Sequence, residues 1–145
     1  MHIMALMAEV NRYKTSAARI TGDNYREIER VARKAHNQIA RLSKRQPYIR
    51  SKYFKKSKIF IKPFWEHLAQ KHITDRKRRL RFYNHAIELL RNTTCAPSSK
   101  QNPADKNEIL HRFHGITSDG EKYAVQVKYN VQSGWHTFMS VFPEN

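Results

Sequence analysis

The chain has 145 residues, enough for one domain with a modest hydrophobic core. Its 28 Lys and Arg against 12 Asp and Glu give a formal net charge of +16, which favours a polyanionic partner, nucleic acid before an anionic membrane. No apolar run reaches the length of a membrane span, the single Cys95 excludes an internal disulfide framework, and residues 1–10 lack the cationic start of a signal peptide, so we expect a cytoplasmic protein.

The charge is unevenly distributed along the chain. Residues 1–100 hold 24 basic and 7 acidic residues, a net charge of +17. Residues 101–145 hold 4 basic and 5 acidic residues, a net charge of −1. This separation suggests a basic helical N-terminal arm over residues 1–55 and a compact α+β domain over residues 56–145.

The first predicted element is an amphipathic helix over about residues 24–44, with Asp23 or Asn24 as its N-cap. Apolar side chains recur at helical spacing through it. They are Tyr25, Ile28, Val31, Ala32, Ala35, Ile39 and Leu42. Arginines and lysines lie mainly off this stripe. A cationic face of this kind suits contact with phosphates, but it is also typical of a solvated surface helix.

Residues 41–62 carry nine Lys and Arg and no acidic residue. Tyr48, Tyr53 and Phe54 are interleaved with these cations. Such a pattern suits single-stranded nucleic acid, because the charges can follow phosphates while the rings stack on bases. A basic linker whose rings dock on the domain would show the same pattern, and both interpretations stay open.

A short strand is expected over residues 58–61, followed by a helix with Pro63 in its first turn. This helix carries Phe64, Trp65 and Leu68 on its apolar side. A further helix begins near Thr74, which is its predicted N-cap, with Asp75 in the first turn. Residues 92–107 contain two prolines among Asn, Ser and Thr, and are expected to form a loop.

The predicted helix from Thr74 has five cations near its N-terminus, where positive charge opposes the helix dipole. They are Arg76, Lys77, Arg78, Arg79 and Arg81. A bound phosphate would offset that cost, as would Asp75 and solvent. We therefore treat Arg76, Arg78 and Arg79, together with Lys62, as candidate RNA-binding residues.

The last part of the chain predicts three strands, over about residues 108–114, 121–129 and 135–142. The first turn contains Asp119-Gly120, a strong hairpin signal, and the second covers residues 130–134. Connections this short imply an antiparallel meander. The expected fold class is α+β, with N-terminal helices packed on a small antiparallel β-sheet at the C-terminus.

Alternation assigns the strand residues to two faces. The face expected to pack on the helices contains Ile109, Phe113, Tyr123, Val125, Val127, Met139 and Val141. The other face gathers polar groups, namely Arg112, His114, Gln126, Lys128, His136 and Ser140. His111 falls on the apolar side, and a single bulge would move it to the other face.

The polar face holds the groups that metal-free RNA cleavage requires: a base for the 2'-OH, an acid for the leaving 5'-oxygen, and cations for the phosphate. Histidine suits either proton role near neutral pH. Arg112 and Lys128 would hold the phosphate, and Ser140 or Gln126 would add hydrogen bonds. A solvated or purely binding face has a similar composition. No metal-binding motif or glycine-rich phosphate loop is present, so no metal or other cofactor is expected.

Two segments, EILHRFHGITSDGEKYAVQVKYN and TFMSVFPEN, carry a family resemblance. The chain resembles, over roughly residues 56–145, the barnase–EndoU–colicin–RelE superfamily of metal-independent RNases, in particular its phage and mobile-element branches. The similar positions are His111-Arg112, Tyr123, Val125, Gln126, Lys128 and the run from Ser140 to Pro143. The resemblance implies an endoribonuclease toxin with a cognate acidic antitoxin.

The first hypothesis is therefore a metal-independent endoribonuclease. Its expected catalytic residues are His111, Arg112, His114, Lys128 and Ser140, and its expected substrate-binding residues are Gln126, His136, Arg76, Arg78, Arg79 and Lys62. The second is a non-catalytic RNA- or ribosome-binding protein, based on the charge of the first hundred residues. The third is an interaction protein that uses its charge against an acidic partner.

Overall fold

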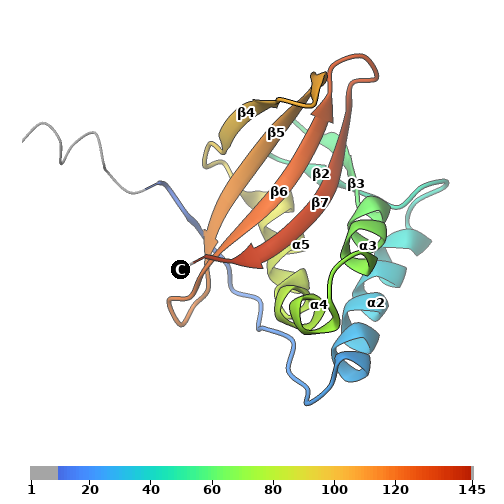
Figure 1. Ribbon diagram of the computed structural model, residues 1–145, viewed down its shortest axis with the longest axis vertical. Helices are drawn as coiled ribbons and strands as arrows, with labels where there is room; N and C mark the ends of the chain where they lie inside the picture. Colours follow the sequence, from blue (N-terminus) through green and yellow to red (C-terminus); the bar gives the residue numbers. More distant parts are fainter. Residues whose placement is uncertain (1–9, 145) are drawn as a thin grey trace, which may run out of the picture.

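The computed structural model describes residues 10–144 (Figure 1). Within this range the helices are α2 (Tyr25–Arg41), α3 (Lys62–Ala69), α4 (Ile73–Leu80) and α5 (Tyr83–Asn92). The strands are β1 (Tyr13–Lys14), β2 (Tyr48–Ser51), β3 (Ser57–Phe60), β4 (Ser98–Asn102), β5 (Asp105–Ile116), β6 (Lys122–Asn130) and β7 (Trp135–Pro143). The prediction that no signal peptide is present concerns residues 1–10. Of these, residues 1–9 lie outside the described part of the chain.

The strands form one curled sheet in the order β1-β5-β6-β7-β3-β2, and β4 also pairs with β5 (Figure 1). Strands β5, β6 and β7 form the predicted antiparallel meander, which is confirmed. Strand β3 joins β7 in parallel, and β2 pairs antiparallel with β3. On the other side of the meander, β1 pairs in parallel with one end of β5.

The predicted α+β class is confirmed, but the predicted layout is wrong in two respects. The seven-stranded sheet is larger than expected, and the helices are not confined to the N-terminal part, because β1, β2 and β3 come before α3. A three-stranded meander would leave two long edges with unpaired backbone groups. Strands β1 and β3 each pair with two residues of these edges, and residues 98–102, expected as loop, add β4 beside β5.

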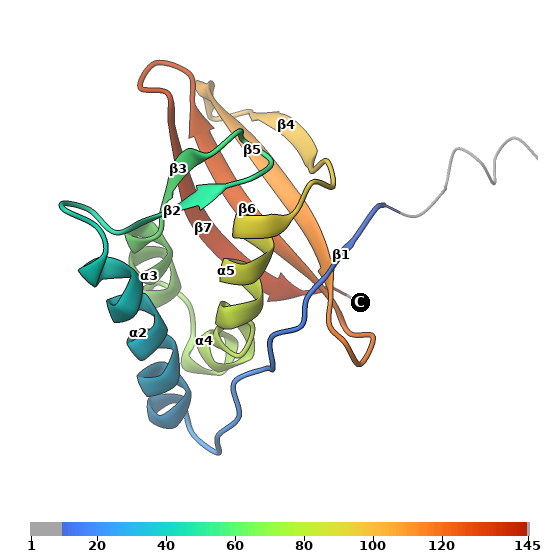
Figure 2. The ribbon, with the colours of Figure 1, turned by 180° about the vertical axis from the view of Figure 1, so that it is seen from behind.

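The helices pack on one face of the sheet, and Figure 2 shows α5 in front of β6 and β7. The core includes Ile28, Ala32 and Ile39 of α2, together with Ile49 of β2 and Phe113, Val125, Phe138 and Val141 of the meander. Residues on both sides of position 55 thus contribute to one core. In the described chain, no helix is both long enough and apolar enough to span a membrane.

The start of α2 follows the predicted capping. The side-chain oxygen of Asn24 accepts a hydrogen bond from the Glu27 amide at 3.0 Å. The Glu27 carboxylate in turn accepts one from the Asp23 amide at 3.1 Å. This reciprocal pattern satisfies amides that the first turn of a helix leaves unpaired.

The single helix predicted from Thr74 is wrong, because it is divided into α4 and α5 by a break after Leu80. His72, rather than Thr74, caps α4, with its Nδ1 accepting from the Thr74 amide at 3.2 Å. Lys77, Arg78 and Arg79 therefore lie in the last turn of a short helix. The helix dipole favours positive charge there, so these three cations do not carry the unfavourable dipole interaction that the sequence predicts.

A β-bulge in β7 changes the predicted faces. Gln126 faces Ser140 and Val127 faces Phe138, which leaves Met139 as the additional residue. Phe138, instead of Met139, is buried and stacks on Phe64 with 4.5 Å between ring centroids. The same bulge moves His136 to the core face, so its predicted place on the polar face is wrong.

Candidate active site on the open face of the sheet

The face of the sheet opposite the helices carries a row of polar residues on neighbouring strands. Arg112 of β5 lies opposite Gln126 of β6, which lies opposite Ser140 of β7. Ser98 of β4 extends the row, because it pairs with Arg112. The row borders a cavity of about 260 Å³ whose lining includes Ser98, Arg112, His114 and Gln126. Cross-strand pairing thus brings together residues separated by more than 40 positions in the sequence.

Two guanidinium groups lie near the Phe142 ring, next to the β7 end of this row. Arg79 of α4 donates a hydrogen bond from Nη1 to the Ser140 hydroxyl at 2.7 Å. The guanidinium carbons of Arg79 and Arg112 lie 5.4 and 5.1 Å from the centroid of the Phe142 ring. Asp75 pairs with Arg79 at 2.9 Å, while Arg112 forms no ion pair within residues 10–144. Two guanidinium groups beside one ring form a suitable site for a phosphate.

His114 lies beside this row and makes one contact through each ring nitrogen. Its Nε2 lies 2.9 Å from the Ser98 hydroxyl, and its Nδ1 lies 3.3 Å from a Glu144 carboxylate oxygen. Arg12 donates to the same oxygen of Glu144 at 2.8 Å. Burial alone would raise the pKa of Glu144, but the hydrogen bonds from Arg12 and His114 outweigh it and lower that pKa.

An ionised Glu144 selects one tautomer of His114. A carboxylate only accepts hydrogen bonds, so Nδ1 carries the proton that faces it. The Nε2 of the neutral ring is then an acceptor and faces the Ser98 hydroxyl. This is the arrangement in which an imidazole removes a proton from a hydroxyl group. Ser98 and Glu144 belong to no recognisable motif, so the sequence alone does not identify them as site residues.

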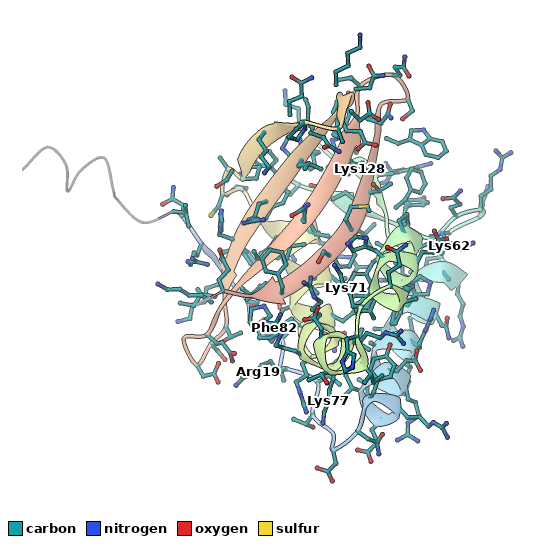
Figure 3. All side chains as sticks on the ribbon, viewed as in Figure 1. Arg19, Lys62, Lys71, Lys77, Phe82 and Lys128 are labelled. Carbon is teal, nitrogen blue, oxygen red and sulfur yellow. The ribbon has the colours of Figure 1, made fainter. Side chains whose placement is uncertain are left out.

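Lys128 lies on the same face, in the row next to Arg112 and Gln126. It faces Thr137 of β7, and its ammonium group lies 3.3 Å from a Glu108 carboxylate oxygen. The charge of Lys128 also affects the pKa of His67 in α3. Burial lowers the pKa of His67 first, and the charges of Lys71, Arg79 and Lys128 lower it further. Figure 3 shows Lys71 and Lys128 on the side of the molecule turned toward the viewer.

His111 and His136 lie on the core face instead. The His111 ring lies 5.3 Å from that of Phe54, and its Nδ1 lies 2.7 Å from the Ser99 hydroxyl. The His136 ring stacks on Phe54 at 4.0 Å. Burial, followed by the charge of His111, lowers the pKa of His136 to about 4. Neither imidazole belongs to the Arg112 row, but His111, which is on the predicted side of the sheet, is among the residues that line the 260 Å³ cavity.

The other predicted substrate-binding cations have different positions. Arg76 donates to the backbone oxygens of Lys71 and Ala69 and holds the end of α3. Arg78 pairs with Asp75 at the surface. Lys62 lines a separate depression with Arg33 and Trp65. Of the four cations predicted outside the meander, the structure brings Arg79 to the candidate site.

No group of three or more His, Cys, Asp or Glu side chains within residues 10–144 is placed to hold a metal ion. The open face of the sheet contains a base with an oriented tautomer, guanidinium groups and hydroxyl groups. Comparison of the chain with protein-family models, with curated proteins and with solved structures gave no match.

Proposed function

We propose that the protein is a metal-independent endoribonuclease that acts at the open face of the sheet. The observation that carries this proposal is the position of His114 beside the Arg112–Gln126–Ser140 row, with Arg79 at the other end of that row. A proton acceptor and two guanidinium groups at one surface match the requirements of phosphodiester cleavage by an adjacent hydroxyl. The resemblance described above implies the same activity.

In the proposed reaction, a 2'-hydroxyl of RNA replaces Ser98 as the partner of His114 Nε2. His114 takes the hydroxyl proton, and the 2'-oxygen attacks phosphorus. Arg112 and Arg79 bind the non-bridging oxygens and stabilise the charge that develops on them. The 5'-oxygen leaves, and the products are a 2',3'-cyclic phosphate and a 5'-hydroxyl.

The leaving oxygen also needs a proton. His67 is a second imidazole of this region, but its lowered pKa keeps it mainly neutral near pH 7 and makes it a poor acid there. His114 gains a proton in the first step, and its Glu144 contact stabilises the imidazolium. We therefore assign both proton transfers to His114, first as base and then as acid.

The test is incubation of the purified protein with single-stranded RNA in EDTA, with analysis of the product ends. The wild type should form 2',3'-cyclic phosphate ends. His114→Ala should lower the rate by about 10²- to 10⁴-fold, and Arg112→Ala by about 10²- to 10³-fold. Arg26→Ala is the matched control, because Arg26 is exposed on α2, away from the sheet. Intact RNA with the wild type, or equal cleavage by all variants, would contradict the proposal.

A toxin role, with a cognate acidic antitoxin, forms part of the proposal because the resemblance implies it. Induced expression of the wild type in bacteria should stop growth and degrade RNA, whereas His114→Ala should do neither. Growth arrest by both forms with RNA left intact would favour the non-catalytic RNA- or ribosome-binding alternative. That alternative is based on the net charge of +17 in residues 1–100.

The Ser98–His114–Glu144 contacts favour a second candidate, acyl transfer with Ser98 as nucleophile. The distances of 2.9 and 3.3 Å suit a Ser–His–carboxylate arrangement. The guanidinium groups beside it favour a phosphate over an ester or amide. Labelling of Ser98 by a fluorophosphonate, absent in Ser98→Ala, would support this candidate.

A further inference from the structure

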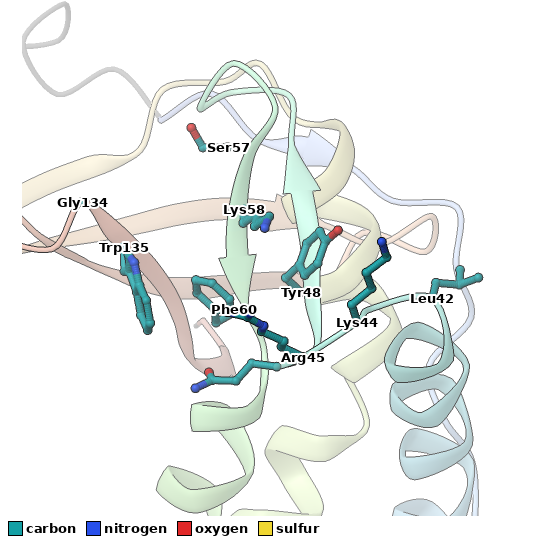
Figure 4. Close-up of a pocket in the computed structure, with 10 residues that line it drawn as sticks. Leu42, Lys44, Arg45, Tyr48, Ser57, Lys58, Phe60, Gly134 and Trp135 are labelled. Carbon is teal, nitrogen blue, oxygen red and sulfur yellow. The ribbon is translucent and has the colours of Figure 1, made fainter.

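A second concave surface lies where β2 and β3 meet the start of β7 (Figure 4). Its volume is about 1010 Å³. We call it the β2–β3 groove, and its lining residues include Tyr48, Lys58, Phe60 and Trp135, with Lys44 and Arg45 from the segment after α2. None of the catalytic residues proposed above lines this groove.

Three aromatic rings follow one another across this groove. The Tyr48 and Phe60 rings lie 6.4 Å apart between centroids, and the Phe60 and Trp135 rings lie 4.8 Å apart. Trp135 keeps 51% of its surface exposed, although it is one of the largest apolar side chains of the protein. Figure 4 shows the three side chains in sequence from β2 to β7. Exposed rings in a concave site are typical of surfaces that stack on a partner.

Positive charges accompany these rings. Lys58 Nζ lies 4.6 Å from the centroid of the Tyr48 ring, and the Arg50 guanidinium carbon lies 5.5 Å from it. Lys44 and Arg45 are exposed at the rim and form no ion pair within the described chain. The described residues that line the groove include no carboxylate. The surface therefore complements a polyanion that also carries flat, stackable groups.

The strand register connects the groove to the candidate active site. Tyr48 faces Phe60, Phe60 faces Thr137 and Thr137 faces Lys128, so four strands carry one row. Lys128 follows Gln126 by two residues on β6, which is about 7 Å along a strand. On β7, Thr137 precedes Ser140 by three residues, because the bulge adds Met139. A continuous strand of nucleotides leaving the Arg112 row can therefore reach the groove across Lys128.

We propose that the β2–β3 groove binds single-stranded RNA, with bases stacked on Trp135, Phe60 and Tyr48 and phosphates held by Lys44, Arg45 and Lys58. Single strands fit this surface because their bases are available for stacking, whereas duplexes present mainly phosphates to such a groove. The binding does not depend on the cleavage proposed above. RNA binding in the groove would give part of the positive charge of residues 41–62 a defined role.

The test uses a fluorescently labelled 12-nucleotide RNA in EDTA, with 2'-O-methyl groups that prevent cleavage, and measures anisotropy. Trp135→Ala should weaken binding by about 5- to 150-fold, and Trp135→Phe by less, since one ring remains. Lys44→Ser with Arg45→Ser should weaken binding and reduce its salt dependence. Arg26→Ser with Lys34→Ser removes the same charge from exposed sites on α2 and is the matched control. Unchanged circular dichroism would establish that each variant is folded.

Several outcomes would overturn the proposal. If the Lys44→Ser/Arg45→Ser variant and the Arg26→Ser/Lys34→Ser variant bind the RNA equally well, the RNA is attracted by net charge alone. Unchanged binding by Trp135→Ala would exclude stacking in the groove, and equally tight binding of heparin would indicate a general polyanion site. Tenfold tighter binding of the matching DNA would assign the groove to single-stranded DNA instead. If the wild type binds RNA in the groove but does not cleave it, the proposed endoribonuclease activity is contradicted, whereas RNA binding by the groove is supported.

Discussion

The Nε2 atom of His114 lies 2.9 Å from the hydroxyl oxygen of Ser98, across the pairing of β4 with β5. The opposite nitrogen of the same ring faces Glu144 near the end of the chain. Three segments that the sequence does not link by any motif thus converge on one imidazole.

Replacement of Ser98 separates the two candidate reactions. In RNA cleavage Ser98 only occupies the position that the 2'-hydroxyl takes, so Ser98→Ala should cleave RNA at a rate within about threefold of the wild type, a difference below 1 kcal/mol in barrier. In acyl transfer the same variant should lose all activity, because the nucleophile is absent. Steady-state rates with RNA and with an activated ester, measured on the same preparation, distinguish the two results.

Glu144 is predicted to be a positioning residue for His114. Glu144→Gln should lower kcat by up to about 10⁴-fold, because an amide no longer selects the tautomer with a free Nε2. Arg12→Ala is the control, because it removes a partner of Glu144 but leaves the carboxylate beside His114. An unchanged kcat in Glu144→Gln would contradict this role.

Gly115 is predicted to be required for packing. A Cβ at this position would lie 2.3 Å from the Tyr123 ring, whose hydroxyl donates to Thr15 inside the core. Gly115→Ala should therefore lower the free energy of unfolding by about 1–3 kcal/mol, as overpacking does. Chemical denaturation measures this loss. In a Tyr123→Leu background the added methyl group should cost less, and a cost that stays the same would show that the Tyr123 ring is not its cause.

His136 should make stability depend on pH. The pKa of His136 is about 4 in the folded protein, against 6.5 for an unperturbed histidine, because the ring is buried between Phe54 and Tyr129 and lies near His111. The unfolded chain binds the proton more readily, so stability falls as pH drops from about 6.5 to about 4. Each kcal/mol lost should lower the melting temperature by about 3–5 °C.

Thermal unfolding of His136→Phe between pH 4 and pH 7 tests this prediction. The variant keeps a ring for Phe54 but cannot bind a proton, so its melting temperature should vary less with pH. Some dependence remains, because burial also lowers the pKa of His36, His85 and His111. His72→Asn, which keeps a capping side chain at an exposed position, is the control. An equal pH dependence in His136→Phe and the wild type would contradict the prediction.

The sequence alone determined the elements whose signals are local. Asn24 and the apolar stripe predict α2, Pro63 predicts the start of α3, and Asp119-Gly120 predicts the β5–β6 turn. Cap geometry, proline conformation and turn chemistry act over a few residues and can be read without tertiary contacts. The same holds for Arg112, Gln126 and Ser140, which strand alternation places on one face.

Only the tertiary structure decided how distant segments meet. The need to pair sheet edges brought β3 to β7 and β4 to β5, and with β4 came Ser98. One bulge at Met139 put both His136 and Phe138 on the core face instead of the open face, because a shift of one residue reverses every side chain beyond it. Ser98, His114 and Glu144 thus form one constellation through pairings between strands and a contact of the chain end, and neither depends on local sequence.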